Sequence, residues 1–455
     1  MKPIKLEDIA HAVDGRLNNP NIAHKTVCGV HFDTREDISG KLFVALKGVR
    51  DGHDFIENAI NGGAVCALSE VETDFDAIIV SDAMKALGQL ASYYLSLFDV
   101  KVIGLTGSSG KTSCKDMIAS VLSEKYSVIK TQGNYNNEIG MPLTIFNITD
   151  ETEIAVLEMG MNNRWEIHRL SKIANPYVAV ITNIGMAHIE NLGSQEEIFN
   201  AKSEILDFLV EDGKVILYGD DEFLKRHKNR ADAVFYGRGE QNDYIATNEK
   251  NNKLTGSSYS VVLKNGEKID LIVPVAGRHM VTNSLAAAAV GECFGLNSKE
   301  IASGLEKFKP TGHRMDIFET KCGITIIADC YNANPDSMRA ALNVLAMADG
   351  DKIAILGDMF ELGDISQHEH YKIGCLAAKI GLETLVCIGK DAKHIYEGAY
   401  SKHSEDESKS QIMYFDTKAC FFEHMPQIIK KGDCVLVKAS AGMKFDEIVR
   451  ELSES

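Results

Sequence analysis

The sequence predicts an α/β protein built from three domains, and three observations indicate this. Apolar, strand-like runs alternate with helix-like segments from Lys101 onward, the alternation resumes at Ile324, and 455 residues suffice for about three domains of ordinary size. We expect residues 1–99 to form a small α/β domain and residues 100–311 a mainly parallel sheet with an antiparallel part. Residues 312–455 are expected to form a doubly wound, Rossmann-like domain.

The first domain ends in a helix-like segment and carries two polar, glycine-bearing loops on either side of an apolar strand. These loops suit hydrogen bonding to a polar ligand, and their candidate binding residues are Thr34, Arg35, Asp51 and His53. An ordinary turn at Asp51-Gly52 is the alternative, and from the residues alone the turn is favoured.

A glycine-rich turn follows the first strand of the second domain, in Lys101-Val-Ile-Gly-Leu-Thr-Gly-Ser-Ser-Gly-Lys-Thr-Ser113. Glycines let several backbone N–H groups point into one small volume, and the positive end of the next helix attracts an anion. The residues expected to hold the phosphates of a nucleotide are Gly107, Ser108, Ser109, Gly110, Lys111, Thr112 and Ser113. Lys111 would reach the outer phosphates, and Thr112 would bind Mg²⁺. Leu105 replaces the first glycine of the general pattern, so a helix-capping loop is the alternative.

Two polar residues come late in, or after, further predicted strands of this domain. Glu158 lies near the end of the strand predicted at 153–160, and His188 follows the strand at 178–182. Because the carboxyl ends of parallel strands meet at one edge, both residues should lie near the glycine-rich turn. A metal ion at the phosphates would offset the burial of a carboxylate, and a neutral imidazole could bind a second cation. Either residue alone would be interpreted as a hydrogen-bonded core group, but together they favour a metal site.

The antiparallel part of the second domain is expected between Asp243 and Pro274, where Asn265-Gly266 marks a hairpin at an edge of the sheet. In the third domain, the polar loops at 329–335 and 357–363 follow predicted strands. They therefore emerge on the side where doubly wound sheets bind ligands.

Composition restricts the classes of partner. The net charge of −17 disfavours binding to nucleic acid or to an anionic membrane. The start of the chain has no apolar core of a signal peptide, and no later run approaches the roughly 18 apolar residues of a membrane span. Ten cysteines without a C-x-x-C pair fit free thiols. We therefore expect a cytoplasmic protein without membrane insertion, and we expect it to be a monomer.

Five motifs occur together in this chain. They are Thr106-Gly-Ser-Ser-Gly-Lys-Thr-Ser113, Asn136-Asn-Glu-Ile-Gly-Met-Pro142, Asn183-Ile-Gly-Met-Ala-His188 with Ala201-Lys-Ser-Glu204, Gly277-Arg-His-Met-Val-Thr-Asn283 and Asp329-Cys-Tyr-Asn-Ala-Asn-Pro-Asp-Ser-Met338. This set resembles the Mur ligases of peptidoglycan synthesis over nearly the whole chain. The closest resemblance within the family is to the ligases that add D-alanyl-D-alanine, and Tyr331-Asn-Ala-Asn-Pro335 is the most discriminating part.

The resemblance implies an ATP-dependent reaction that activates the carboxylate of UDP-N-acetylmuramoyl-tripeptide as an acyl phosphate and joins it to D-alanyl-D-alanine. It implies two Mg²⁺ ions, one held by Thr112 and Glu158, the other by His188 and a carbamylated Lys202. By chemistry alone, Lys202 would be an ordinary solvated lysine. The expected catalytic residues are Lys111, Glu158, His188 and Lys202.

The same resemblance implies which residues contact ATP and which contact the substrates. Family positions that contact ATP match Asn283, Arg314 and Asp329, in addition to the glycine-rich turn. Substrate-binding positions match Asn136, Asn137, Tyr331, Asn332 and Asn334, and the two N-terminal loops match the region that binds the UDP-sugar.

Two departures from the family pattern put local loop contacts in doubt. Tyr218-Gly219 precedes the paired aspartates where an asparagine is usual, and the segment 438–443 carries alanines where glycine and arginine are common. Two other functions are weighed: another ligase of the family, which adds a diamino acid or acts on folate, and a nucleotide-driven switch or motor.

Overall fold

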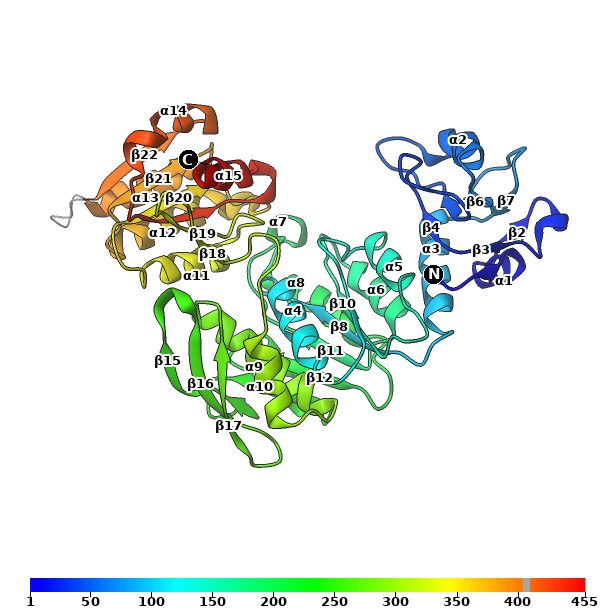
Figure 1. Cartoon of the computed structure of the whole chain (residues 1–455), viewed down its shortest axis with the longest axis horizontal. Coiled ribbons are helices and arrows are strands. Elements are labelled where there is room, and N and C mark those ends of the chain that lie inside the picture. The colour runs from blue at the N-terminus through cyan, green and yellow to red at the C-terminus, as the bar shows by residue number, and fades with distance from the viewer. Residues whose placement is uncertain (404–409, 455) are drawn as a thin grey trace.

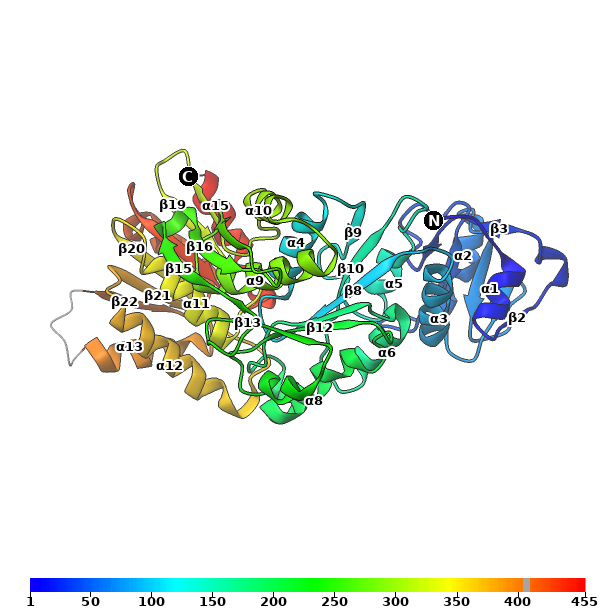
Figure 2. The same cartoon turned by 90° about the horizontal axis from the view of Figure 1, so that it is seen from below.

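Three sheet-containing parts follow one another along an elongated molecule. The computed structural model describes residues 1–403 and 410–454. The N-terminal part lies at one end, the C-terminal part at the other, and the central part joins them (Figures 1 and 2). Each sheet lies within one of the three predicted segments, and the domain boundaries themselves stay a prediction.

The N-terminal part holds a five-stranded sheet in the order β2-β7-β6-β5-β4, in which only β2 runs antiparallel to its neighbour. A separate antiparallel pair joins β1 and β3. The elements are β1 (Ile4–Lys5), α1 (Leu6–Ala12), β2 (Arg16–Leu17), β3 (Thr26–Val27), β4 (Val30–His31), β5 (Leu42–Val44), α2 (Ile56–Asn61), β6 (Cys66–Ser69), β7 (Ala77–Ile79) and α3 (Ala83–Leu95).

Helix α3 packs the N-terminal part against the central part. Its N-terminus is capped by the Asp82 side chain, which accepts a hydrogen bond from the Lys85 N–H. Its buried face, which includes Leu90 and Tyr94, packs in one core with Phe146 of the central part. The Tyr94 hydroxyl donates a 2.7 Å hydrogen bond to the Ile148 carbonyl. The two parts are therefore packed together and are not merely linked.

The central part is built on a seven-stranded, wholly parallel sheet in the order β14-β13-β12-β11-β8-β10-β9. Its elements are β8 (Lys101–Thr106), α4 (Lys111–Leu122), β9 (Val128–Lys130), α5 (Gly140–Ile145), β10 (Ile154–Glu158), α6 (Glu166–Ala174), β11 (Val178–Ile181), α7 (Ile189–Leu192), α8 (Gln195–Ser203), β12 (Lys214–Tyr218), β13 (Ala233–Gly237), β14 (Tyr244–Ile245), α9 (Arg278–Cys293) and α10 (Ser298–Glu306). Strand β8 lies between β10 and β11, so the glycine-rich turn leaves the middle of the sheet.

The predicted antiparallel strands are present, but they do not form an edge of this sheet. They pair as a three-stranded sheet of their own: β15 (Thr247–Asn251), β16 (Ser257–Val262) and β17 (Lys268–Val273). The edge of the large sheet is instead β14, which runs parallel to β13. A turn at Asn265-Gly266 specifies the hairpin locally, but nothing in it specifies which sheet the hairpin joins.

The two faces of the central sheet contribute to different cores. Ile103 and Leu105 of β8 pack in a core that extends into the C-terminal part, whereas Val102 packs in the core shared with the N-terminal part. Successive side chains of a strand point to opposite faces, so a continuous apolar run covers both.

The C-terminal part has a six-stranded sheet in the order β18-β19-β23-β20-β21-β22, parallel except for β18 at one edge. Its elements are β18 (Asp316–Glu319), β19 (Thr325–Ala328), α11 (Pro335–Leu345), β20 (Lys352–Gly357), α12 (Ser366–Lys379), β21 (Thr384–Ile388), α13 (Ala392–His403), β22 (Gln411–Phe415), α14 (Lys418–Ile428), β23 (Cys434–Lys438) and α15 (Asp446–Glu454). In the described residues, no helix is long and apolar enough to cross a membrane.

The connection between the central and C-terminal parts is short and bent. Gly312, His313 and Met315 all have positive φ, at 67°, 50° and 54°. On the central side, the Thr311 hydroxyl donates a 2.6 Å hydrogen bond to Asp116 Oδ2 of α4. On the other side, the Met315 N–H donates to Asp329 Oδ1. The bend is thus held at both ends.

Candidate active site

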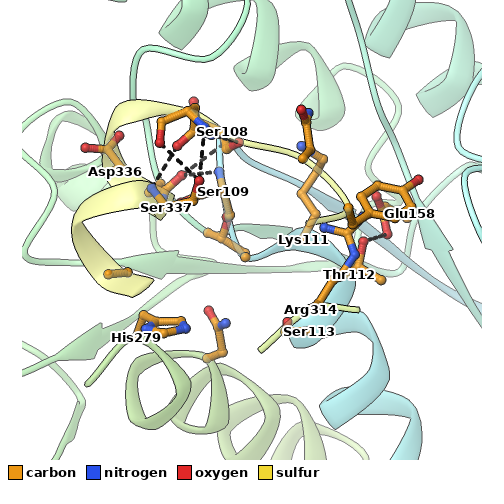
Figure 3. Close-up of a pocket in the computed structure, with 18 of the residues that line it drawn as sticks. Ser108, Ser109, Lys111, Thr112, Ser113, Glu158, His279, Arg314, Asp336 and Ser337 are labelled. Carbon is orange, nitrogen blue, oxygen red and sulfur yellow. Dashed lines mark hydrogen bonds between the residues drawn. The ribbon is translucent and has the colours of Figure 1, made fainter. Parts of the chain in front are cut away.

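The glycine-rich turn lies where the sequence predicts it, between β8 and α4. Gly107 and Gly110 have φ of 153° and 76°, and Gly110 is the N-cap of α4. The Asn183 side chain accepts hydrogen bonds from the N–H groups of Ser108 and Ser109, at 3.0 and 2.9 Å. Lys111 Nζ donates to the Gly107 carbonyl at 2.7 Å, so its ammonium folds back over the turn. Figure 3 shows Lys111 beside the start of the helix.

Beside this turn, Thr112 and Glu158 face each other from α4 and the end of β10. Thr112 Oγ1 donates a 2.9 Å hydrogen bond to Glu158 Oε2 (Figure 3), and Asn136 Nδ2 donates one of 2.9 Å to Oε1. Glu158 is almost fully buried. Both carboxylate oxygens are therefore oriented by neutral donors at the foot of the turn.

A buried lysine that the sequence reasoning missed lies next to Glu158. Lys115 is 2% exposed, and its Nζ is 3.7 Å from Glu158 Oε2 and 3.5 Å from Asp116 Oδ1. It donates a 2.8 Å hydrogen bond to the Thr131 carbonyl. The signal was available, because Lys115 is one helical turn after Lys111 and so lies on the same face of α4.

Lys202, near the end of α8, is not a surface residue: it is 1% exposed. Burial is the main cause that lowers the pKa of Lys202 well below its ordinary value, and the nearby Lys111 charge lowers it further. Among the described residues, no carboxylate forms an ion pair with it. A lysine in this position favours the neutral amine, which is the reactive form.

His188 is the N-cap residue of α7 and lines the pocket described below, with a left-handed backbone φ of 66°. Its Nδ1 atom is 2.6 Å from Oε2 of Glu361, in the C-terminal part. The histidine is the main cause that holds the pKa of Glu361 below its usual range. The predicted metal-binding histidine thus lies at the contact between two domains.

The C-terminal part supplies the opposite wall. Lys438 Nζ donates hydrogen bonds to Asp329 Oδ2 at 2.6 Å and to the Asn332 carbonyl at 3.0 Å. The Arg314 guanidinium lies over the Tyr331 ring, 3.7 Å from its centre. Asn334 caps α11 and approaches the Ser108 carbonyl, with Nδ2 at 3.5 Å. The residues predicted in the loop at 329–335 therefore do face the glycine-rich turn.

Together these groups enclose a pocket of about 870 Å³ between the central and C-terminal parts. The predicted site residues that line it are Ser108, Ser109, Gly110, Lys111, Thr112, Ser113, Asn136, Asn137, Glu158, His188, Asn283, Arg314, Asp329, Tyr331, Asn332 and Asn334. Asn283 Nδ2 is buried there without a hydrogen-bond partner in the described structure. An unpaired buried donor is costly, so the pocket is shaped for a polar ligand.

Some predicted residues lie elsewhere. Gly107 and Lys202 do not line this pocket, and neither do the four N-terminal candidates. Thr34 and Arg35 follow β4, whereas Asp51 and His53 follow β5, and β4 and β5 are adjacent parallel strands. Both loops therefore follow the carboxyl ends of neighbouring parallel strands in the N-terminal sheet. They do not line the central pocket.

Comparison with known proteins identifies the family. Residues 105–291 match the Mur ligase middle domain, and residues 313–441 match the Mur ligase, glutamate ligase domain. The chain belongs to the Mur ligase family. Among relatives of this Mur ligase, the UDP-N-acetylmuramoyl-tripeptide–D-alanyl-D-alanine ligase of Bacillus subtilis is 40% identical, over 99% of this chain and 98% of the relative.

Solved structures agree with this assignment. A crystal structure of MurF from Acinetobacter baumannii matches this Mur ligase with a TM-score of 0.92 and 32% identity, over 100% of both chains. MurF ligase from Thermotoga maritima, solved in complex with ADP, matches with a TM-score of 0.82 and 30% identity, over 93% of this chain and 97% of that one. The three-domain α/β architecture predicted from the sequence is confirmed.

The donors at the foot of the turn fit a Mg²⁺ ion that keeps phosphate and water ligands. Mg²⁺ prefers oxygen, and the Thr112 hydroxyl and Glu158 carboxylate supply it. In residues 1–403 and 410–454 of this Mur ligase, no group of three or more His, Cys, Asp or Glu side chains is arranged to hold a metal ion.

Proposed function

We propose that this chain is an ATP-dependent ligase that joins D-alanyl-D-alanine to UDP-N-acetylmuramoyl-tripeptide. Full-length relatives that carry this enzyme's name support the proposal, and a relative solved with ADP supports nucleotide use. They also favour this ligase over the diamino-acid, folate and switch alternatives. The observation that carries the proposal is the two-sided pocket, in which an anion cradle faces a second domain.

The first step activates a carboxylate. One oxygen of the tripeptide carboxylate attacks the γ-phosphorus of ATP, the bond to the β,γ-bridging oxygen breaks, and ADP leaves with that electron pair. The product is an acyl phosphate. The backbone N–H groups of residues 110–113, at the start of α4, and the ammonium of Lys111 would stabilise charge on the transferring phosphoryl oxygens. Burial is the main cause that lowers the pKa of Lys111, and the charge of Glu158 offsets part of that shift.

Two Mg²⁺ sites are part of the proposal. Thr112 and Glu158 would hold one ion, and His188 with a carbamylated Lys202 would hold the other. Bound Mg²⁺ supplies neutralisation of the phosphate oxygens. The burial of Lys202 supports carbamylation, because its neutral amine can attack CO₂ and lose a proton to give an anionic carbamate. The anionic carbamate would then be a ligand for the second cation.

The second step forms the amide. The free amine of D-alanyl-D-alanine attacks the acyl carbon, loses a proton, and phosphate leaves from the tetrahedral intermediate. Water would hydrolyse the acyl phosphate, so the C-terminal domain should cover it. We assign ATP contacts to Asn283, Arg314 and Asp329, which lie on both sides of the pocket.

Substrate binding is proposed for the remaining predicted residues. Asn136, Asn137, Tyr331, Asn332 and Asn334 line the pocket beside the cradle. The N-terminal loops that carry Thr34, Arg35, Asp51 and His53 would bind the UDP-sugar end. A cytoplasmic, monomeric enzyme stays a prediction.

Product analysis tests the proposal. With the purified full chain, ATP and Mg²⁺, we expect ADP, phosphate and UDP-N-acetylmuramoyl-pentapeptide only when UDP-N-acetylmuramoyl-tripeptide and D-alanyl-D-alanine are both present. Omission of either substrate is the control. Steady release of phosphate without them would instead support a switch or motor.

A further inference from the structure

The loop after β20 brings a carboxylate from the C-terminal domain to His188. Glu361 Oε2 is 2.6 Å from His188 Nδ1, and the Glu190 N–H donates to the Glu361 carbonyl at 3.3 Å. Side-chain and backbone contacts therefore join the same two loops. The two loops belong to different domains, so the contact exists only while the domains are together.

The backbone at this contact is conformationally costly on both sides. His188 and Glu361 are non-glycine residues with φ of 66° and 63°. Left-handed conformations of this kind persist where the surroundings impose them, and they concentrate at functional sites.

The C-terminal loop is held firmly on its own side. The Met359 N–H donates to His370 Nε2 at 2.9 Å, and the Phe360 N–H donates to Ser440 Oγ at 2.9 Å. The Ser440 N–H in turn donates to the Asp358 carbonyl at 3.0 Å. The residues before Glu361 are thus fixed to the core of their domain, so the carboxylate is presented from a rigid support.

His188 needs such a partner. Its Nδ1 atom is buried, and in the described residues it makes no hydrogen bond of regular geometry. The carboxylate at 2.6 Å is the group that can satisfy it. A histidine that binds a metal through one ring nitrogen commonly donates the other N–H to a carboxylate, which fixes the tautomer and the ring orientation.

We propose that Glu361 is a positioning residue for His188: its carboxylate accepts a hydrogen bond from Nδ1–H, so that Nε2 keeps its lone pair for the second cation. This rests on the proposed function. Because Glu361 belongs to the C-terminal domain, the cation ligand is oriented only in the closed arrangement. Binding of the second cation and domain closure therefore stabilise each other.

Cation binding by the full-length enzyme with ADP tests this, with Mn²⁺ as the probe and electron paramagnetic resonance to count free ions. Glu361→Ala should weaken one of two Mn²⁺ sites by about tenfold or more. Glu361→Gln retains an acceptor oxygen and should restore part of that loss. Glu397→Ala is the matched control, since Glu397 also contacts a histidine, His394, at 2.8 Å, but outside the pocket.

A second measurement reads the imidazole directly. In the protein without metal, nitrogen-15 shifts of His188 should report the Nδ1–H tautomer, and Glu361→Ala should give a mixture. These shifts in the unsubstituted protein decide the matter if the variant does not fold.

Three results would overturn the assignment: unchanged Mn²⁺ affinity in Glu361→Ala, a defect confined to the KM for D-alanyl-D-alanine, or an Nε2–H tautomer in the unsubstituted protein. The second would mean that Glu361 touches the amine substrate. Failure of the unsubstituted enzyme to bind any Mn²⁺ with ADP is different, because it would overturn the metal sites of the proposed function.

Discussion

Thr112 Oγ1 and Glu158 Oε2 are joined by a 2.9 Å hydrogen bond between the helix after the glycine-rich turn and the neighbouring strand. The hydroxyl has two lone pairs left, so it can bind a cation while it orients the carboxylate. Thr112→Val keeps the shape and removes this oxygen. We expect kcat/KM to fall by about 10²–10³, as for other single transition-state contacts. Thr112→Ser should keep most activity, and equal activity of the two variants would exclude a role for the hydroxyl.

Removal of the Lys111 ammonium should abolish turnover. In Lys111→Ala no cation folds over the cradle, and we expect amide formation to fall by at least about 10³. The measurement is pentapeptide formed at saturating substrates, with the unfolding midpoint in urea as a check of folding. Normal amide formation would refute the assignment of the cradle.

Lys202→Ala should be inactive and should recover in part when short carboxylic acids are added. An acid such as acetate can occupy the space that the side chain leaves and supply the oxygen of the missing carbamate. The assay compares rates with and without added acid, with Lys202→Arg as a variant too bulky for rescue. Full activity without any added acid would show that this buried lysine has no catalytic part.

Lys438→Met should destabilise the C-terminal domain. Lys438 is 1% exposed and its Nζ lies 2.6 Å from Asp329 Oδ2, so the change leaves a poorly solvated carboxylate. Loss of one partner of such a pair costs about 3 kcal/mol or more. Urea unfolding of the full chain measures it. The partly exposed pair of Lys418 and Glu447 is the control, because Lys418→Met should cost no more than about 1 kcal/mol.

Acid should destabilise the protein through His279, which lines the pocket. Burial is the main cause that lowers its pKa from 6.5 to about 4. Below pH 6.5 the unfolded chain binds a proton that the folded chain does not, so stability falls between pH 6.5 and 4. We expect about 1–3 kcal/mol from this residue. His279→Gln should flatten the fall in unfolding midpoint over that range, and substitution of the exposed His24 should leave it unchanged.

Periodic patterns predicted most of the elements. The strand and loop at 101–113 are specified by an apolar run followed by glycines, and the structure places both where the pattern does. Placing Glu158 and His188 near the cradle needed only the rule that parallel strands end at one edge. The sheet that the hairpin at 265–266 joins could not be predicted, because it depends on packing between residues far apart in the sequence.

The burial of polar residues was the property that the sequence predicted least well. Lys115 and Lys202 lie in polar stretches of helix, where side-chain type alone indicates solvent. Only the packed structure shows that both are covered. Glu361 was missed for another reason: its contact joins two domains, and a local pattern carries no information about such a pairing.

Because the two faces of the central sheet belong to different cores, the central part should not be stable when it is expressed without its neighbours. Ile103 and Leu105 belong to one core and Val102 to the other, although all three lie on one strand. An isolated fragment of residues 100–311 would present to water apolar surface that each neighbour normally covers. Such a fragment should aggregate when expressed alone, and co-expression of the missing ends in trans should restore its solubility.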